Sequence, residues 1–415
     1  MAYRTINPAT GKVVKTYDDI SDAAVSEAMD VAQACCENDW PLRSIAQSCH
    51  IAATGRLTVH RVKTRGVKVP LTFSLGTAVA VVNKVPLLLV DVETVEGITG
   101  RSYLFCYTSS GARAIAEHLR EAVDLVPDLP LTPLELAQFL QKRFALLGVT
   151  GTVRMALSAL DIALWDALGQ QLSLPLTSLL AAPARPLHAY DSRGLGLMPP
   201  SQLADEAVRL SESGLKALKL RLGYPTRSED LAAVEAVRRA IGPGIGIMVD
   251  YNQSLSPAEA IHRGRALDDC GLLWIEEPIR HDEYESYKAI SRDLKTPIQL
   301  GENFNGPEAV QKAVKVSASD YIMPDVARIG GVTGWLQAAG IAAASGIEMS
   351  SHLMPEISAP LLCSTPSAHW LEWVDWAEAI LEEPMQLSNG MAIPLSSPGI
   401  GLRWDESRLG KLDTL

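Results

Sequence analysis

The chain contains 415 residues with a mass of 44.7 kDa, of which 47% are hydrophobic and 20% are charged. This length exceeds what one ordinary hydrophobic core needs, so at least two folded domains are expected. The formal net charge of −11 would repel nucleic acid and anionic membrane surfaces, which excludes both as partners and favours a small molecule.

The cysteines and the N-terminal residues indicate in which cellular compartment the protein is expected. The six cysteines are scattered without CxxC spacing, which predicts neither a zinc site nor a disulfide framework and favours reduced thiols in the cytoplasm. The first residues lack a basic segment followed by an apolar run, so we expect no signal peptide.

Residues 1–55 differ in character from the rest of the chain. Residues 6–14 predict a short hairpin, and residues 21–38 have the periodicity of a helix with Ser21 as its N-cap. The run Ile6-Asn7-Pro8-Ala9-Thr10-Gly11 resembles the N-terminus of aldehyde dehydrogenases, but the segment is too short to hold their nucleotide-binding fold or catalytic cysteine. We interpret it as an extension without chemistry of its own, and a disordered leader is the alternative.

Residues 56–185 predict an α+β domain. Apolar alternation over residues 57–95 indicates strands, and residues 109–180 have helical periodicity. The most apolar stretch, residues 71–92, is interrupted by Asn83 and Lys84, so it predicts two paired strands and not a membrane span.

From residue 186 onward, short β-like runs alternate with helical ones through residue 380. Eight such units predict a (β/α) TIM-like barrel, so the whole chain is assigned to the α/β class. The eight runs are LHAYDS, LKALKLRL, GIMVDY, LLWIEE, PIQLGE, DYIMPD, GIEMSS and AHWLEW.

A polar side chain ends each run, and in a barrel these ends meet at one mouth, where active sites lie. In chain order they are Ser192, Lys219 with Arg221, Asp250 with Asn252, Glu276, Glu302, Asp325, His352 and Glu372.

Three of these residues predict a metal site. Asp250, Glu276 and Glu302 are equally spaced along the chain, so successive strands present one carboxylate each at the same height. Converging carboxylates repel one another unless a cation lies between them. Ligands that are all oxygen favour Mg²⁺, with Mn²⁺ as the alternative. Helix caps or surface acids are the usual roles of a single Asp or Glu, but three in register argue against them.

The remaining strand ends predict acid–base chemistry. The side chains of Lys219 and Arg221 point to the same interior face because strand side chains alternate. Asp325 and His352 are expected to pair, with the carboxylate fixing the tautomer of the imidazole and raising its basicity. A base beside a metal suits proton abstraction from carbon next to a carboxylate, and a protonated Glu372 would donate to the same oxygens. A structural salt bridge is the alternative role of Glu372.

The motifs over residues 57–415 resemble the mandelate racemase family of the enolase superfamily, nearly residue for residue. They are Ser102-Tyr-Leu-Phe-Cys-Tyr-Thr, Met248-Val-Asp-Tyr-Asn-Gln-Ser, Trp274-Ile-Glu-Glu-Pro, Gly301-Glu-Asn, Met323-Pro-Asp, Ile329-Gly-Gly-Val-Thr-Gly-Trp and Ser350-Ser-His-Leu. The resemblance implies a modified barrel with a capping domain over its mouth, a C-terminal segment (residues 381–415) that returns to that domain, and a homo-oligomer.

The same resemblance implies roles for single residues. Asp250, Glu276 and Glu302 would bind Mg²⁺, and Lys219 would be the first lysine of the family's Lys-x-Lys pair. Asn252 would contact the substrate hydroxyl, Ser192 and Glu372 its carboxylate, and Asp325 with His352 would be the base for the (R) face. The second lysine, which is the base for the (S) face, is Arg221 here. A guanidinium keeps its proton at neutral pH, so efficient racemisation of both enantiomers is in doubt.

The capping domain bears on the substrate. An apolar wall is expected from Val79, Val82, Phe105, Tyr107 and Leu353. Such a wall suits an aromatic or otherwise apolar 2-hydroxy acid, because polyol hydroxyls would lack partners against it. The alternative is that these residues form the ordinary core of the cap.

Three functions follow from these residues. The first is an isomerase like mandelate racemase, which acts on a 2-hydroxy acid through an enediolate. The second is a dehydratase of acid sugars that uses the same base. The third is a homologue that binds metal and carboxylate without catalysis.

Overall fold

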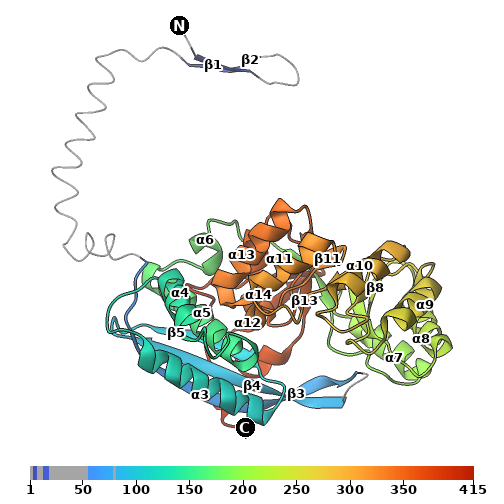
Figure 1. The fold of residues 1–415 in the computed structure, drawn as a ribbon, viewed down its shortest axis with the longest axis horizontal. Coiled ribbons are helices and arrows are strands. Elements are labelled where there is room, and N and C mark those ends of the chain that lie inside the picture. Colours follow the sequence, from blue (N-terminus) through green and yellow to red (C-terminus); the bar gives the residue numbers. More distant parts are fainter. Residues whose placement is uncertain (1–2, 7–12, 18–54, 78–80) are drawn as a thin grey trace. The chain divides into compact units, whose positions relative to one another are not determined.

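The computed structural model describes residues 3–6, 13–17, 55–77 and 81–415, and the chain divides into units at residues 1–54 and 55–415 (Figure 1). In the first unit, β1 (Tyr3–Ile6) and β2 (Val13–Tyr17) pair antiparallel, which confirms the predicted hairpin. The helix predicted over residues 21–38 and the wall residue Val79 lie outside the described residues.

The second unit begins with an antiparallel sheet in the order β16-β3-β4-β5. Its strands are β3 (Val59–Gly76), β4 (Val81–Thr94), β5 (Thr99–Phe105) and β16 (Asp413–Thr414). The hairpin predicted over residues 71–92 is confirmed and is longer than predicted. Since β16 pairs with β3, the chain ends in the sheet that opens this unit.

Four helices follow, in agreement with the helical periodicity of residues 109–180: α3 (Ser109–Leu125), α4 (Pro133–Arg143), α5 (Gly151–Leu172) and α6 (Leu176–Leu179). A capping box of Thr132 and Glu135, with a proline at the first helical position, fixes the start of α4. Helix α5 is apolar on almost every side because it lies between the sheet and the helices α12 and α13 of the barrel (Figure 1).

All eight predicted barrel strands are present. They are β6 (Leu187–Asp191), β7 (Ala217–Arg221), β8 (Gly246–Asp250), β9 (Ile275–Glu276), β10 (Ile298–Leu300), β11 (Tyr321–Ile322), β12 (Glu348–Met349) and β13 (Leu371–Trp373). They pair in parallel from β6 to β12, and β13 closes the ring by pairing with β6.

The barrel helices are α7 (Pro200–Ser211), α8 (Arg227–Ile241), α9 (Pro257–Leu267), α10 (Tyr284–Asp293), α11 (Pro307–Val316), α12 (Val326–Ile329), α13 (Gly331–Ala344) and α14 (Pro355–Ser364). The expectation of eight complete strand–helix units is wrong at the last one. A single 3-10 turn, η1 (Trp376–Ala379), follows β13, and the chain then forms β14 (Gln386–Ser388), β15 (Met391–Ile393) and α15 (Glu406–Leu409). Strand β15 adds to β6 in antiparallel orientation, so the polypeptide after β13 covers the barrel and then returns to the first sheet.

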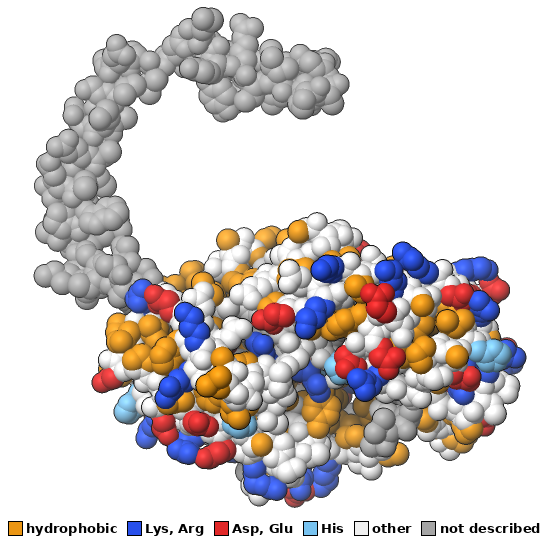
Figure 2. All heavy atoms as spheres, viewed as in Figure 1, with side chains coloured by type: hydrophobic (Ala, Val, Ile, Leu, Met, Phe, Trp, Pro, Cys, Tyr) orange, Lys and Arg blue, Asp and Glu red, His pale blue; other side chains and the backbone are white. Residues whose placement is uncertain are grey.

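Charged side chains lie on the surface, and apolar side chains form the core of the barrel. On the face drawn in Figure 2, acidic and basic side chains of the described residues lie interleaved. No helix among the described residues is long and apolar enough to cross a membrane. In the barrel interior, a small aromatic layer of Tyr190 and Trp274 with Met248 lies below the strand ends. The ionisable residues described next therefore rest on a fully buried apolar floor.

Candidate active site

A cavity of about 320 Å³ opens where the C-terminal ends of the barrel strands face the first sheet. Its walls join both parts of the second unit: Leu75, Thr77, Val82, Val85, Phe105 and Tyr107 from the cap, and Lys219, Arg221, Asp250, Asn252, Gln253, Glu302, Asn303, Arg328, His352, Leu353, Glu372, Val374 and Trp376 from the barrel. Most predicted site residues are in this set. Ser192, Glu276 and Asp325 are not in this set, but each contacts a residue of it: Glu372, Lys219 and His352, respectively.

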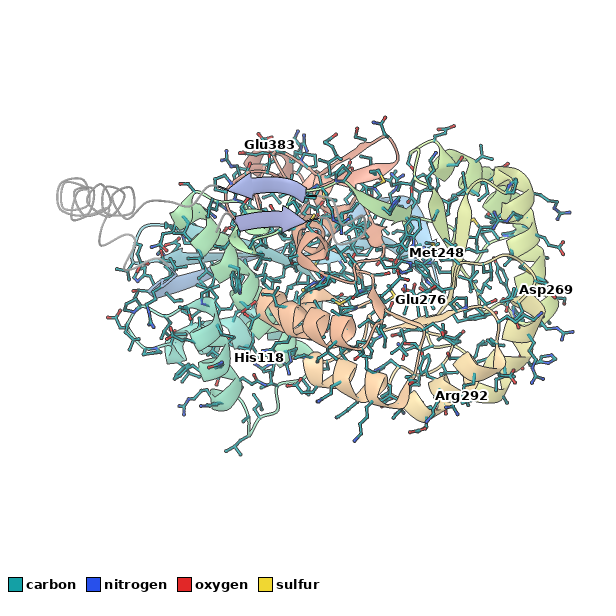
Figure 3. The ribbon with its side chains drawn as sticks, turned by 90° about the horizontal axis from the view of Figure 1, so that it is seen from above. His118, Met248, Asp269, Glu276, Arg292 and Glu383 are labelled. Atoms are coloured by element: carbon teal, nitrogen blue, oxygen red, sulfur yellow. The ribbon has the colours of Figure 1, made fainter. Side chains whose placement is uncertain are left out.

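The three predicted metal ligands lie together. One carboxylate oxygen from each of Asp250, Glu276 and Glu302 lies within 4.8 Å of the others. Asp250 and Glu276 are register partners on β8 and β9, and Glu302 follows β10. In Figure 3 the labelled Glu276 lies inside the ring, whereas Asp269 and Arg292 lie at its outer edge.

The electrostatics of this cluster fit a divalent cation. Burial raises the pKa of Glu276 to about 8 even though the Lys219 ammonium opposes the shift. A carboxyl group in such surroundings is neutralised either by a proton or by a cation. Three converging oxygen ligands without Cys or His match the preference of Mg²⁺.

Polar neighbours orient each of these carboxylates. Asn252 donates to both oxygens of Asp250, from its backbone N–H at 2.7 Å and from Nδ2 at 3.0 Å. The Trp274 indole donates to Glu276 Oε2 at 3.2 Å. These contacts fix the direction of the ligand oxygens before any ion arrives.

The third carboxylate, Glu302, accepts from Asn303 Nδ2 at 3.0 Å, and Asn303 Oδ1 in turn accepts from Arg328 at 2.9 Å. Sequence reasoning missed Gln253, Asn303, Arg328, Trp274 and Trp376. Asn303 could have been found because it directly follows Glu302. Trp274 and Gln253 stand in the quoted motifs beside Glu276 and Asn252, whereas nothing in the local sequence signals Arg328 on helix α12 or Trp376 in the turn η1.

Lys219 is buried at the centre of the acidic cluster. Its Nζ lies 2.6 Å from Glu372, 2.8 Å from Glu276 and 3.5 Å from Asp250. Burial opposes its charge, but these carboxylates outweigh burial and raise the pKa of Lys219 above its usual range. Lys219 therefore acts as a fixed positive charge at neutral pH and does not accept a proton.

The predicted dyad is formed. His352 Nδ1 lies 2.8 Å from Asp325 Oδ2, and the other oxygen of Asp325 caps helix α12 through Ala327 N–H, which fixes the carboxylate. The imidazole Nε2 is left facing Glu302 at 3.3 Å. Burial opposes protonation of His352, but Glu302, Glu372 and Asp325 raise its pKa to about 9. Because Glu302 belongs to the carboxylate cluster, a cation bound there would weaken the largest of these attractions.

Arg221 lies at the end of β7 with its guanidinium held by oxygens of the loop after β6. Nη1 donates to the carbonyls of Ser192 and Gly194 at 3.0 and 2.8 Å, and Nη2 donates to Ser192 Oγ at 2.8 Å. The interior orientation predicted for Lys219 and Arg221 is confirmed, since both side chains line the cavity at the barrel mouth.

The surroundings of Glu372 disfavour the protonated state on which its predicted donor role depends. Although burial favours protonation, the Lys219 ammonium and His352 outweigh it and hold the pKa of Glu372 below its usual range. The carboxylate accepts from Ser192 Oγ at 2.7 Å and from Leu353 N–H at 2.8 Å. Glu372 is therefore an ion-paired acceptor, which is the alternative that the sequence left open.

An apolar wall faces these charged groups. Val82, Phe105, Tyr107 and Leu353 line the cavity as predicted. Phe105 stacks on Tyr107 at a centroid distance of 4.2 Å and meets Trp376 edge-on at 5.1 Å. Phe105, Tyr107 and Trp376 thus form a continuous aromatic surface in the cavity wall, and the Arg328 guanidinium lies over the Tyr107 ring at 4.9 Å.

Comparison with known proteins identifies relatives of both parts of this unit. Residues 57–181 match the mandelate racemase / muconate lactonizing enzyme N-terminal domain, and residues 202–408 match the enolase C-terminal domain-like family. Both matches begin after residue 56, so they leave the resemblance of residues 1–55 to aldehyde dehydrogenases untested.

Solved structures and curated relatives agree with these matches. An enolase from an alphaproteobacterium (bal199), solved with bound Mg, is 41% identical with a TM-score of 0.84, covering 86% of this chain and 100% of that one. An enolase from Bradyrhizobium, solved with magnesium and mandelic acid, is 40% identical with a TM-score of 0.82, covering 87% and 99%. L-talarate/galactarate dehydratase from Salmonella typhimurium is 29% identical over 327 residues, covering 78% of this chain and 81% of the relative.

Proposed function

This chain belongs to the mandelate racemase/muconate lactonizing enzyme family of the enolase superfamily, and we propose that it is a Mg²⁺-dependent enzyme that removes the α-proton of a 2-hydroxy carboxylate. The single observation that carries this proposal is the His352–Asp325 dyad, whose free imidazole nitrogen lies at the carboxylate cluster of Asp250, Glu276 and Glu302.

The side chains of the site have different roles in the proposed reaction. Asp250, Glu276 and Glu302 would hold the ion, which supplies positive charge to the substrate carboxylate when bound. Lys219 adds a fixed positive charge beside them. Because Asp325 accepts from Nδ1 of His352, Nε2 is left to take the proton from the α-carbon.

The aromatic wall bears on the substrate class. Phe105, Tyr107 and Trp376 offer aromatic surface in the cavity wall, which favours an aromatic or apolar substituent on the α-carbon. The mandelic acid bound by the Bradyrhizobium relative is an acid of this kind. We therefore favour an activity like that of mandelate racemase, in which His352 removes the α-proton on one face of such an acid.

A dehydratase of acid sugars is the second candidate, and Arg221 favours it. Racemisation needs a base on each face of the α-carbon, whereas Arg221 is fixed to carbonyl oxygens and cannot give up its proton. Elimination of a β-hydroxyl needs a base for the α-proton and a donor that protonates the leaving hydroxyl. His352 can fill both roles, because the imidazolium formed in the first step can donate its proton in the second. The dehydratase relative from Salmonella typhimurium supports this reading.

The test is incubation with Mg²⁺ in D₂O, using both enantiomers of mandelate and a set of sugar acids, followed by NMR. A racemase yields the deuterated enantiomer, and a dehydratase yields a 2-keto acid. Substrate-induced stabilisation without deuteration of any acid would contradict both reactions and leave the binding-only homologue.

A further inference from the structure

Arg221 stands where the family has its second lysine, and the proposed proton abstraction does not use it. We propose that Arg221 is a positioning residue: it holds the loop after β6 in the shape that receives the cap hairpin β3–β4. We call residues 192–198 of this loop the docking segment. Through it, Arg221 sets the position of the apolar wall over the cavity.

The first step is the contact between Arg221 and the docking segment. In addition to its bonds to Ser192 and Gly194, its backbone N–H donates to the carbonyl of Leu195 at 2.9 Å. One residue thus bonds to three positions of the segment, while its own side chain is only 5% exposed. A lysine offers a single ammonium and does not match this planar set of acceptors.

The docking segment needs such support because its backbone is strained. Leu195 adopts a left-handed conformation with φ of 54°, which is costly for a residue with a β-carbon and persists only where surrounding contacts determine it. Leu195 is completely buried, and its N–H donates to Glu206 Oε1 at 2.6 Å. Glu206 therefore fixes the N–H of this strained residue, and the backbone of Arg221 fixes its carbonyl.

The second step is the contact between the docking segment and the hairpin. Leu197 N–H donates to the carbonyl of Gly76 at 2.9 Å. A β-carbon on Gly196 would lie 2.3 Å from the backbone nitrogen of Gly76, so the two chains meet backbone to backbone. This close approach depends on the exact course of the docking segment, and a small shift of the loop would break it.

A side-chain contact completes the docking. The guanidinium groups of Arg193 and Arg209 lie over the ring of Phe73 at 5.5 and 5.0 Å from its centroid. Arg193 is itself oriented by Asp191 at 2.7 Å and by Asp375 at 3.4 Å. The hairpin is thus attached to the barrel through residues that neighbour the segment that Arg221 holds.

The last step links the hairpin to the cavity. Leu75 and Val82 are register partners on β3 and β4, and both line the cavity that Arg221 also lines. Displacing the docking segment would move Leu75 directly, since Gly76 is its neighbour. Arg221 therefore acts on substrate fit through the hairpin and not as a base.

The test is hydrogen–deuterium exchange on the full chain, and it does not depend on catalysis. Arg221→Met removes the donors at similar volume, and we expect exchange in residues 69–76 and 192–198 to accelerate about tenfold or more, since bonds from a charged donor are lost. Arg238→Met is the matched control. Arg238 is a partly buried arginine that donates through Nη1 to the loop carbonyls of Gly242 and Ile245 at 3.0 and 2.6 Å, and neither of these residues bonds to the docking segment.

Unchanged exchange of residues 69–76 in Arg221→Met would overturn the inference, as would equal acceleration there in both variants. If Arg221→Met does not fold, Phe73→Leu breaks the docking from the hairpin side. It should accelerate exchange in residues 69–76 and leave the exchange of the backbone amides of residues 192–195 unchanged. Protection of the hairpin in Phe73→Leu equal to that of the unaltered protein would then overturn the inference.

A kinetic measurement rests on the proposed function as well. Phe73→Leu should raise KM for mandelate, whose ring meets the wall, about tenfold, and leave KM for lactate, which lacks the ring, unchanged. An equal change for both acids would contradict positioning of the wall. Absence of turnover with either acid would count against the proposed function alone, because the exchange measurement stands without it.

Discussion

Among the described residues that line the cavity, only one side offers a base, and this predicts that α-hydrogen exchange is strongly unequal for the two enantiomers of a substrate. On one side of the cavity, His352 with Asp325 can accept a proton. On the other side, Lys219 is held by three carboxylates and Arg221 by loop carbonyls, so neither accepts a proton at neutral pH. A positioned general base contributes about 10² to 10⁴ in rate, and the enantiomer facing away from His352 should exchange more slowly by about that factor.

The assay is α-deuteration of each mandelate enantiomer in D₂O with Mg²⁺, followed by NMR over time. By resemblance to the family, the (R) enantiomer should be the fast one. Arg221→Lys should raise exchange of the slow enantiomer, because the pKa of an amine beside the Lys219 ammonium shifts toward neutrality. Equal exchange of both enantiomers in the unaltered protein would refute the reasoning and require a base on the side of Arg221.

Three further predictions concern the metal, the N-terminal segment and a buried carboxylate. EDTA should abolish exchange, and Glu276→Gln should weaken Mg²⁺ binding by about tenfold to a hundredfold in calorimetry, so full activity in either case would argue against the metal site. A shortened chain that begins at Ala53 should keep its kcat, since every site residue lies beyond that point; loss of turnover in a folded shortened chain would show that residues 1–55 complete the site. Asp166 accepts from the backbone of Arg101 and Ile400, so Asp166→Asn should lower the free energy of unfolding by about 2 kcal/mol in urea. Burial raises the pKa of Asp166 to about 6, so its contribution to stability is fully present below about pH 4 and declines as pH rises to 6; the difference in unfolding free energy between the unaltered protein and Asp166→Asn should therefore shrink over this range, and a constant difference would assign the pH dependence to other groups.

The barrel and the carboxylate cluster could be predicted from the sequence because both depend on short segments of consecutive residues. Each strand is a short apolar run that ends in one polar residue, and parallel strands bring those ends to one edge. Asp250, Glu276 and Glu302 therefore converge without any knowledge of the loops. The Asp325–His352 pair follows from the same rule, since β11 and β12 are neighbours.

The contacts that determine charge and orientation could not be predicted in this way. The ion pair between Lys219 and Glu372 joins residues far apart in the chain, and it disfavours the protonated form of Glu372. The sequence marks Arg221 as a departure from the family but does not show that backbone carbonyls hold it, because carbonyl positions depend on loop conformation. The missing last helix likewise depends on the return of the chain to the first sheet, and local periodicity does not report such a return.

The most direct test of the central claim compares the unaltered protein with His352→Asn, using the 2-hydroxy acid that exchanges fastest. Both proteins are first shown to bind Mg²⁺ equally by calorimetry, and α-deuteration is then followed in D₂O. We predict that His352→Asn lowers the exchange rate by about 10² to 10⁴. Exchange at the unaltered rate in His352→Asn would contradict the assignment of the His352–Asp325 dyad as the base.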